Sequence, residues 1–527
     1  MLITEILSRN ARLYGPEIAL IEREPAKKRR VDLTWQEFDN QANQIAQVLI
    51  QKGIQKGDRV VQLMMNCIEW LPVYFGILRT GALVVPLNFR FVAKTIKHCS
   101  LTAGAKAFVF GEEFIERLDE ISTDLNRSVE TYIFVGPEEK RPAYAESCLE
   151  LMNQCPAENP ACDISVLDDA ALYFTSGTTG APKATLLTHR NLEFSCYAEN
   201  QHHRQTHEDN FLCLPPLYHT GAKMHWFGNF IVGAKAVILK GIDPIWIMEA
   251  ISEEKVTVVW LLVPWALDIL FAIENADLNL DEYNLDQWRL MHIGAQPVPP
   301  SLIKEWLKYF PNHQYDTNYG LTESTGPGCV HLGLENMYKV GAIGVPGFDW
   351  EARIIDGEGN LVKQGEPGEL AVKGPGVMKE YYGNPEATRE VLVDGWLLTG
   401  DIARQDEDGF IWLVDRKKDV IITGGENIYP VEIENYLQTH PGIQDVAVIG
   451  LHSLRLGEVA AAVIQTKPGQ VLTKAEIDEF CQVLPRYKRP RRIIFDDVPR
   501  NPTGKIEKPK LRKIHAGSAK SFEIYRD

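Results

Sequence analysis

The chain has 527 residues, of which 45% are hydrophobic and 24% charged, and its formal net charge is −16. This length exceeds what one hydrophobic core supports, so two or more domains are expected. The acidic balance argues against nucleic acid as a partner. No basic segment followed by an apolar run opens the sequence, and the most apolar stretch, 256–273, contains Pro264 and Asp268. We therefore predict no transmembrane segment.

Nine cysteines are scattered along the chain without a Cys-x-x-Cys pair. This distribution argues against a zinc finger and against a disulfide framework, and it is typical of a reducing compartment. We predict a cytoplasmic protein. The sequence leaves the oligomeric state open, a homodimer included.

Strand-like and helix-like patterns alternate over the first 400 residues. A capping box at Thr34-Trp35-Gln36-Glu37 opens a predicted helix that ends at Gly53. Strands are predicted at 59–65, 82–85, 107–110, 131–135 and 170–174, with a largely apolar helix over 67–78. This alternation predicts an α/β domain with largely parallel sheets that are covered on both faces.

The pattern changes beyond residue 416. Helices predicted at 430–438 and 473–483 are interleaved with strands at 445–451, 459–465 and 492–495, which indicates a compact α+β unit. We therefore predict a large N-terminal multi-sheet α/β domain over residues 1–417. A small C-terminal α+β domain over 418–527 would follow it.

The most informative segment is a loop that follows the strand predicted at 170–174 and ends at Lys183. It consists of Thr175, Ser176, Gly177, Thr178, Thr179, Gly180, Ala181 and Pro182. Glycines let a backbone approach phosphate oxygens, the hydroxyls add donors, and Lys183 adds positive charge. The loop differs from a Walker A loop, in which Ser or Thr follows the lysine. It predicts a polyphosphate site, and an ordinary surface loop is the alternative on composition alone.

Five segments in this order resemble those of the adenylate-forming superfamily, which includes acyl-CoA synthetases, adenylation domains and luciferases. They are 172–190, Tyr319-Gly320-Leu321-Thr322-Glu323, Gly395-Trp396-Leu397-Leu398-Thr399-Gly400-Asp401, 415–419 with 424–430, and Pro499-Arg500-Asn501-Pro502-Thr503-Gly504-Lys505. The chain is identified as a member of the acyl-CoA synthetase type. The resemblance implies that a carboxylic acid, either fatty or aromatic or alicyclic, is activated by ATP and Mg²⁺ as an acyl-adenylate. The acyl group then passes to coenzyme A with release of AMP.

The resemblance also implies roles for individual residues at the nucleotide. The loop and Lys183 would hold the β- and γ-phosphates, and Thr322 would contact the α-phosphate. Glu323 would hold Mg²⁺, a hard cation that prefers oxygen ligands. Asp401 would accept from the ribose hydroxyls, Arg416 would donate to the ribose and phosphate, and Tyr319 would stack on the base. The predicted ATP/AMP set is completed by Gly294, Ala295, Gln296, Asn318, Gly320 and Ile411.

Catalysis and acyl transfer are assigned by the same resemblance. Lys505 would bridge the carboxylate and the α-phosphate as negative charge builds, and with Thr322, Glu323 and His219 it forms the predicted catalytic set. Rotation at Lys418 would withdraw Lys505 and present Gly424, Gly425 and Glu426 to coenzyme A. His219, His225 and Trp226 would border the acyl pocket, where His219 as an ordinary core histidine is the alternative.

Two alternatives stay open from the sequence. An adenylating enzyme could use another acceptor, either the thiol of a carrier protein or oxygen. The chain could instead be a non-catalytic nucleotide-binding protein. Gly424-Gly425-Glu426-Asn427 favours coenzyme A as the acceptor, and the joint presence of Glu323, Asp401, Arg416 and Lys505 favours an enzyme.

Overall fold

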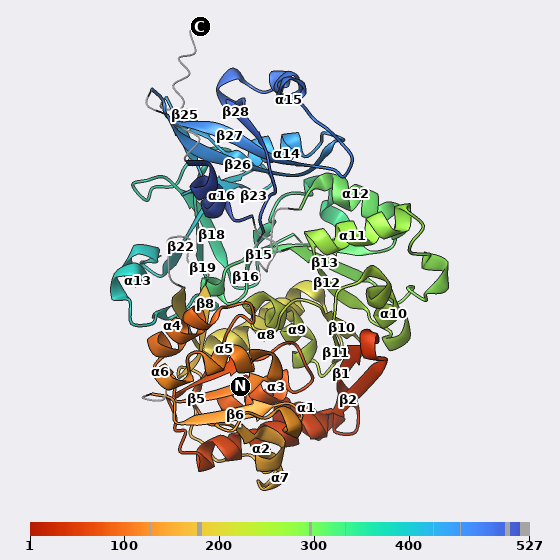
Figure 1. Cartoon of the computed structure of the whole chain (residues 1–527), viewed down its shortest axis with the longest axis vertical. Coiled ribbons are helices and arrows are strands. Elements are labelled where there is room, and N and C mark those ends of the chain that lie inside the picture. The colour runs from red at the N-terminus through yellow and green to blue at the C-terminus, as the bar shows by residue number, and fades with distance from the viewer. Residues whose placement is uncertain are drawn as a thin grey trace.

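The structure is a computed structural model that describes residues 1–125, 128–175, 182–294, 298–331, 334–424, 426–453, 455–500 and 506–516. Figure 1 shows the two largest sheets at one end of the long axis and the C-terminal strands and helices at the other. Among the described residues, no helix is long and apolar enough to cross a membrane.

The first large sheet carries the end of the predicted phosphate loop. Its order is β20-β9-β8-β4-β3-β5-β6-β7, parallel from β8 to β7, with β9 antiparallel to β8. Its strands are β3 (Arg59–Leu63), β4 (Leu83–Pro86), β5 (Ala107–Gly111), β6 (Thr131–Val135), β7 (Glu146–Ser147), β8 (Asp169–Thr175), β9 (Lys183–Thr188) and β20 (Glu380–Tyr381).

The second large sheet has the order β14-β13-β12-β10-β11-β1-β2 and is parallel except for the β1–β2 hairpin. Its strands are β1 (Ile18–Glu24), β2 (Arg29–Thr34), β10 (Asn210–Cys213), β11 (Lys235–Leu239), β12 (Val258–Leu262), β13 (Leu290–Gly294) and β14 (Gln314–Asp316). The strands are mostly buried, as expected for parallel sheets covered on both faces.

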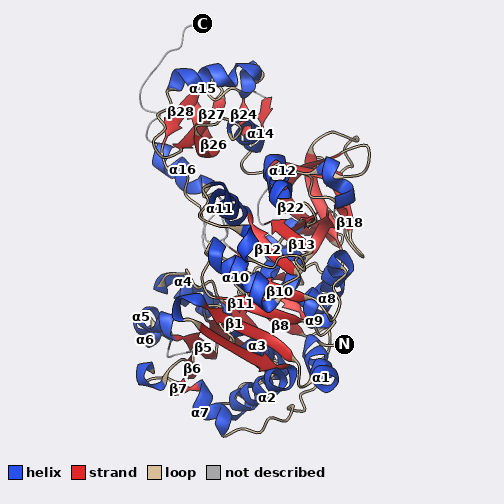
Figure 2. Ribbon diagram, turned by 90° about the vertical axis from the view of Figure 1, so that its right-hand side faces the viewer, coloured by secondary structure: helices blue, strands red, loops and turns tan. Residues whose placement is uncertain are grey.

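Helices fill the space between the two sheets and cover their outer faces (Figure 2). The inner set is α1 (Ile3–Tyr14), α2 (Trp35–Gln51), α3 (Trp70–Arg79), α8 (His189–His203) and α9 (Thr220–Ile231). The outer and peripheral helices are α4 (Ala93–Ala103), α5 (Ile115–Asp119), α6 (Ser122–Leu125), α7 (Cys148–Asn153), α10 (Pro244–Glu254), α11 (Val263–Glu274), α12 (Pro300–Tyr309) and α13 (Pro385–Val391). The predicted capping box is present, since Thr34 Oγ1 accepts from the Glu37 amide and the Glu37 carboxylate accepts from the Thr34 amide.

Two antiparallel sheets follow, which the sequence did not predict. One contains β18 (Glu351–Ile355), β19 (Gly368–Lys373), β21 (Leu392–Val393), β22 (Trp396–Gln405) and β23 (Ile411–Arg416), and the other β15 (Asn318–Gly320), β16 (Pro327–Val330) and β17 (Val345–Pro346). The α/β prediction is confirmed for the two large sheets. Residues 351–416 depart from the predicted alternation because their strands are partly exposed and lack continuous apolar runs.

The predicted C-terminal α+β unit is present, with helices and strands close to the expected bounds. It contains β24 (Ile421–Thr423), β25 (Glu426–Ile428), α14 (Pro430–Leu437), β26 (Ile443–Ser453), β27 (Gly457–Thr466), α15 (Lys474–Phe480), β28 (Arg492–Phe495) and α16 (Lys508–His515). Two buried clusters within this unit form a core of its own. Short 3-10 helices in the chain occupy Pro25–Lys27, Glu112–Phe114, Glu138–Lys140, Leu280–Glu282, Thr322–Ser324, Leu334–Lys339, Cys481–Val483 and Arg486–Lys488.

Candidate active site

The predicted phosphate loop connects two neighbouring antiparallel strands. Thr175 at the end of β8 pairs in register with Lys183 at the start of β9, so the two ends of the loop lie side by side. Ser176, Gly177, Thr178, Thr179 and Gly180 lie outside the described residues. The structure therefore places the base of the loop, while the contacts of its tip stay a prediction.

Glu323 lies beside the base of this loop, and Tyr381 joins the two. The Tyr381 hydroxyl donates to Glu323 Oε1 at 2.7 Å, and the Lys183 ammonium lies 4.8 Å from the centre of the Tyr381 ring. Thr322 and Glu323 belong to a short 3-10 helix directly after β15. Burial and the neighbouring Glu323 carboxylate raise the pKa of Tyr381, so its hydroxyl stays a donor. Sequence reasoning missed Tyr381, because it lies in none of the five matching segments.

A Tyr–Asp–Arg group, with Tyr319 and Asp401 buried and Arg416 partly exposed, joins β15 to β22 and β23. The Tyr319 hydroxyl donates to Asp401 Oδ2 at 2.5 Å, and Arg416 Nε lies 3.2 Å from Asp401 Oδ1. Asp401 and Arg416 are paired residues of β22 and β23, so their contact follows from the strand register. Burial, and then Asp401, raise the pKa of Tyr319 well above its usual value. The sequence singled out all three residues but did not predict the bond between the Tyr319 hydroxyl and Asp401.

The residues predicted around the adenine are brought together only in part. Gly294 ends β13, and Asn318 and Gly320 belong to β15, while Ala295 and Gln296 lie outside the described residues. Ile411 is buried at the start of β23, where its amide donates to the Gly344 carbonyl. Its contact with a nucleotide stays a prediction.

On the predicted acyl side, His219 and His225 flank the first turns of α9. The half-buried His219 caps this helix, because its Nδ1 accepts from the Gly221 amide at 3.2 Å. His225 is buried, with its ring stacked on Trp260 at a centroid distance of 4.4 Å. Its Nε2 lies 2.8 Å from His292 Nε2, so a polar and aromatic surface surrounds it.

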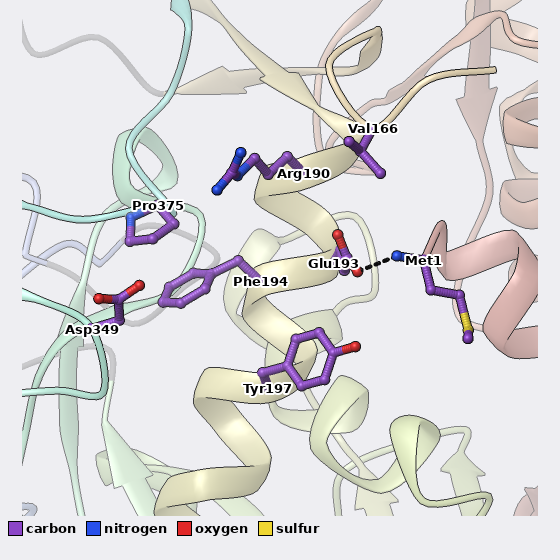
Figure 3. A pocket seen from close by; sticks show the side chains of 8 residues that line it. All are labelled: Met1, Val166, Arg190, Glu193, Phe194, Tyr197, Asp349 and Pro375. Carbon is purple, nitrogen blue, oxygen red and sulfur yellow. Dashed lines mark hydrogen bonds and ion pairs between the residues drawn. The ribbon is translucent and has the colours of Figure 1, made fainter.

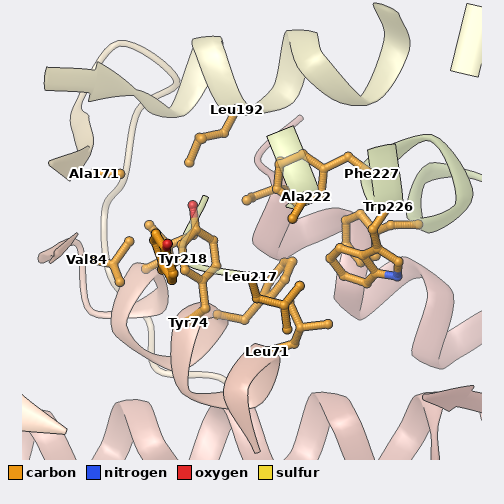
Figure 4. Packing of buried hydrophobic residues seen from close by; sticks show 14 of the residues in the cluster. Leu71, Tyr74, Val84, Ala171, Leu192, Leu217, Tyr218, Ala222, Trp226 and Phe227 are labelled. Atoms are coloured by element: carbon orange, nitrogen blue, oxygen red, sulfur yellow. The ribbon is translucent and has the colours of Figure 1, made fainter. Parts of the chain in front are cut away.

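Trp226 lies on a different face of the same helix. It is fully buried among aromatic rings, with Phe230 at 4.9 Å and Phe75 at 6.2 Å between centroids. Figure 4 shows it packed beside Leu71, Leu217 and Phe227 in the core between the two sheets. The ring contacts of Trp226, with Phe75, Phe227 and Phe230, are therefore those of a core residue.

Lys223, one turn after the start of α9, points into the same core. Its ammonium donates to the Leu217 carbonyl at 2.8 Å and lies 4.5 Å from the centre of the Tyr173 ring. Burial lowers its pKa well below the usual value. Its donors are therefore directed at the Leu217 and His219 carbonyls.

The residues just before the predicted hinge, Lys418, contact both the antiparallel sheet and the C-terminal unit. Lys417 pairs with Glu369 of β19, and its amide donates to the Gly400 carbonyl. On the other side, Asp415 accepts from the Val431 amide of α14.

Lys418 lies between these anchors, and its side chain is exposed along part of its length while its ammonium is partly shielded from water. Burial of its ammonium and the nearby Arg416 lower its pKa to about 8. Gly424 adopts a φ of +58°, and its amide donates to the Leu456 carbonyl at 2.8 Å. Glu426 is exposed in β25, whereas Gly425 and the predicted catalytic Lys505 lie outside the described residues.

A surface pocket of about 330 Å³ lies beside α8, away from these groups (Figure 3). The N-terminal ammonium of Met1 pairs there with Glu193 at 2.5 Å. None of the residues that line it belongs to the predicted site. We assign it no part in the chemistry.

A lysine and a carboxylate at the base of a hairpin whose loop is rich in glycine and hydroxyl residues, together with the Asp401–Arg416 pair, are groups suited to a nucleoside triphosphate. The AMP-binding enzyme family matches residues 7–382, and the AMP-binding enzyme C-terminal domain matches residues 432–505. The chain belongs to the family of AMP-binding enzymes. The predicted type, an AMP-forming acyl-CoA synthetase that uses ATP, Mg²⁺ and coenzyme A, is confirmed.

Individual relatives cover nearly the whole chain. A long-chain-fatty-acid–CoA ligase of Mycobacterium tuberculosis is 32% identical over 93% of this chain and 94% of its own length. A feruloyl-CoA synthase of an Amycolatopsis species is 33% identical over 91% of this chain and 94% of its own. The crystal structure of an anthranilate–CoA ligase with anthranoyl-AMP superposes with a TM-score of 0.89 at 25% identity, covering 98% of both chains.

Proposed function

We propose that this ligase binds ATP across the Tyr319–Asp401–Arg416 group and the Lys183–Tyr381–Glu323 group described above. The observation that carries the proposal is Asp401, a buried carboxylate with one oxygen held by Tyr319 and the other beside Arg416. A carboxylate held in one orientation is suited to accept from the two hydroxyls of a ribose. Its neighbour Arg416 would donate to the phosphate side.

In the adenylation step, this chain would act mainly by positioning and by neutralising charge. Lys183 and the loop would hold the β- and γ-phosphates, and Thr322 would contact the α-phosphate. Glu323 offers the oxygen ligands that Mg²⁺ prefers, and Mg²⁺ bound with ATP supplies charge neutralisation at the phosphates. Lys505 would bridge the attacking carboxylate and the α-phosphate. His219 would border the reacting carboxylate.

We further propose that the chain divides at 417/418 and that Lys418 is the pivot between the two half-reactions. The anchors described above support this division. Arg416 and Lys417 contact Asp401 and Glu369 of the antiparallel sheet, whereas Asp419 pairs with Arg512 of α16 at 2.6 Å. Rotation at Lys418 would exchange Lys505 for Gly424, Gly425 and Glu426, which would line the coenzyme A tunnel.

Coenzyme A as the acceptor can be tested directly. With ATP, Mg²⁺, an accepted acid and coenzyme A, we expect AMP and an acyl-CoA thioester in equal amounts, because the adenylate is consumed by the thiol. A panel of acids read by AMP release and by mass spectrometry of the thioester would establish both the acceptor and the acid. Adenylate formation without thioester at any coenzyme A concentration would instead support another acceptor.

For the acid, we propose an aromatic or alicyclic carboxylic acid rather than a long unbranched fatty acid. The side chains beside His225 support this choice, since they are Trp260, His292 and Asn318. A tunnel for a long alkyl chain needs an apolar lining, because unpaired polar groups lose hydration without a partner. Trp226 would support this wall from the core side.

Replacing His225 with alanine should change the preference among acids. We expect the ratio of kcat/KM values for a substituted and an unsubstituted aromatic acid to change at least about tenfold, because alanine removes a ring from the wall of the proposed pocket. The apparent KM for ATP should stay nearly unchanged. His98→Ala, an exposed histidine of α4, is the control. An equal loss for all acids would contradict the pocket assignment.

We also propose a cytoplasmic location. It is supported by the nine cysteines, all of which lie in the described residues as free thiols. A homodimer stays a prediction, which sedimentation equilibrium would test.

A further inference from the structure

Five ionisable side chains lie buried together between α8, α9 and two strands of the second large sheet. They are Glu199 and His203 of α8, His225 of α9, His292 of β13 and Asp316 of β14. Each is at most 4% exposed. His292 and Asp316 are paired residues of neighbouring parallel strands, so the sheet register itself brings them together. Burying this many ionisable groups is costly unless each charge is compensated.

Three of these side chains direct one atom each toward a common point. His203 Nε2 lies 2.9 Å from Asp316 Oδ2 and 3.1 Å from His292 Nδ1, and His292 Nδ1 lies 3.2 Å from Asp316 Oδ2. The three atoms therefore form a nearly equilateral triangle. Imidazole nitrogen and carboxylate oxygen are both common metal ligands.

The partners of His225 assign the tautomer of His292. His225 Nδ1 lies 2.5 Å from the Gly221 carbonyl, so this nitrogen must carry a proton. His225 Nε2 then accepts, and the Asn318 amide nitrogen at 3.2 Å is a suitable donor. His292 Nε2, 2.8 Å from the same atom, therefore also carries its proton. The other nitrogen of a neutral His292, Nδ1, presents a lone pair to the triangle.

The second histidine has the same arrangement. His203 Nδ1 lies 2.9 Å from Glu199 Oε1, an ion-pair contact, so when a metal ion takes the lone pair of Nε2 the remaining proton of His203 lies on Nδ1 beside that carboxylate. With both histidines neutral, the triangle consists of three lone pairs facing one another. One added proton can lie along only one edge of the triangle, and it brings a single positive charge against the two carboxylates of Glu199 and Asp316.

We propose that His203 Nε2, His292 Nδ1 and Asp316 Oδ2 bind a divalent transition-metal ion, with Zn²⁺ as the expected metal. Tetrahedral bonds of about 2.0–2.1 Å place neighbouring ligand atoms about 3.3–3.4 Å apart, close to the edges of the triangle. A dication is neutralised by Asp316 together with Glu199. Glu199 and His225 are then the outer partners that hold each ligand histidine in its tautomer, a recurring feature of protein metal sites.

The ion would join α8 to two strands whose ends carry other parts of the candidate site. Gly294 follows His292 by two residues, and Asn318 follows Asp316 by two. Both neighbours belong to the predicted nucleotide set, so the ion would position this edge of the site. The proposal itself does not depend on the identity of the acid.

The test is the metal content of the full chain, purified without a histidine tag and measured by inductively coupled plasma mass spectrometry. We expect about one zinc per chain that survives dialysis, as for other protein-ligated zinc sites. Protein stripped with a chelator should take up one Co²⁺ with the visible absorption of a low-symmetry site. Less than a tenth of an equivalent of any transition metal, both as purified and after reloading, would overturn the proposal. If one equivalent of iron were measured instead, the proposed site would be supported and the identity of the metal corrected.

Variants locate the ion. Asp316→Asn and His292→Gln should lower the bound zinc at least about tenfold, whereas Glu199→Gln, which removes only an outer partner, should weaken zinc affinity about 10–100-fold. His202→Gln, the preceding residue on α8 and outside the triangle, is the matched control and should retain the metal. Full metal content in folded Asp316→Asn would place the ion elsewhere and refute the assignment. Because the unmodified chain is measured first, a variant that fails to fold does not remove the test.

Discussion

Lys505→Ala is expected to lower the rate of acyl-adenylate formation about 100-fold or more, the scale for losing one preorganised electrostatic contact. The positive charge of Lys505 is useful only while the carboxylate attacks the α-phosphate and negative charge builds between them. The same variant, supplied with pre-made acyl-adenylate and coenzyme A, should therefore form thioester at close to the original rate. Pyrophosphate exchange measures the first half-reaction, and thioester formation from the adenylate measures the second.

The matched control for this prediction is Lys510→Ala. Lys510 is an exposed lysine of α16 that lies 4.0 Å from the Glu507 carboxylate. Its replacement by alanine should leave the rates of both half-reactions unchanged. Circular dichroism would show that each variant keeps its fold. If Lys505→Ala proved equally impaired in both half-reactions, the alternation of the C-terminal unit between two positions would be the wrong account of this enzyme.

Trp226→Ala is expected to lower the free energy of unfolding of the large N-terminal part by about 3–5 kcal/mol, the usual cost of emptying a buried aromatic site. Trp226 is fully buried and contacts the rings of Phe75, Phe227 and Phe230, so its removal leaves a cavity where α3 and α9 meet. Urea unfolding followed by far-ultraviolet circular dichroism measures the loss. Activity per folded molecule should change far less than stability.

Two further variants separate packing from a role in the pocket. Trp226→Phe keeps an aromatic ring and should cost clearly less than alanine. Trp246→Ala removes a half-buried tryptophan of α10 and should also cost less, because less apolar surface leaves the core. A folded Trp226→Ala of unchanged stability that selects different acids would instead make this residue part of the pocket wall.

Much of the site could be read from the sequence, because its key residues lie in contiguous segments. The phosphate loop directly follows a strand, and Tyr319, Thr322 and Glu323 lie within five residues. Asp401 and Arg416 are fifteen residues apart and meet through a simple antiparallel register. Such local patterns can be recognised in a single sequence without a structure.

Buried parallel strands were also predictable, since they appear as short apolar runs between helices. The strand predicted at 131–135 has the expected bounds in the structure, and the strand predicted at 107–110 is one residue shorter than β5. Strands of 351–416 were missed, because partly exposed antiparallel strands mix polar and apolar residues and give a weaker signal.

Only the tertiary structure brought together side chains that are far apart in the sequence. Tyr381 reaches Glu323 because β20 pairs with β9 at the edge of the first sheet. The spacing of His203, His292 and Asp316 in the sequence forms no recognisable motif, since they lie on one helix and two separate strands. They converge because parallel strands bring residues from separate segments into register, while α8 packs nearby. Local patterning thus determined the nucleotide motifs and the strand–helix order, whereas long-range packing alone decided which polar side chains meet in the buried interior.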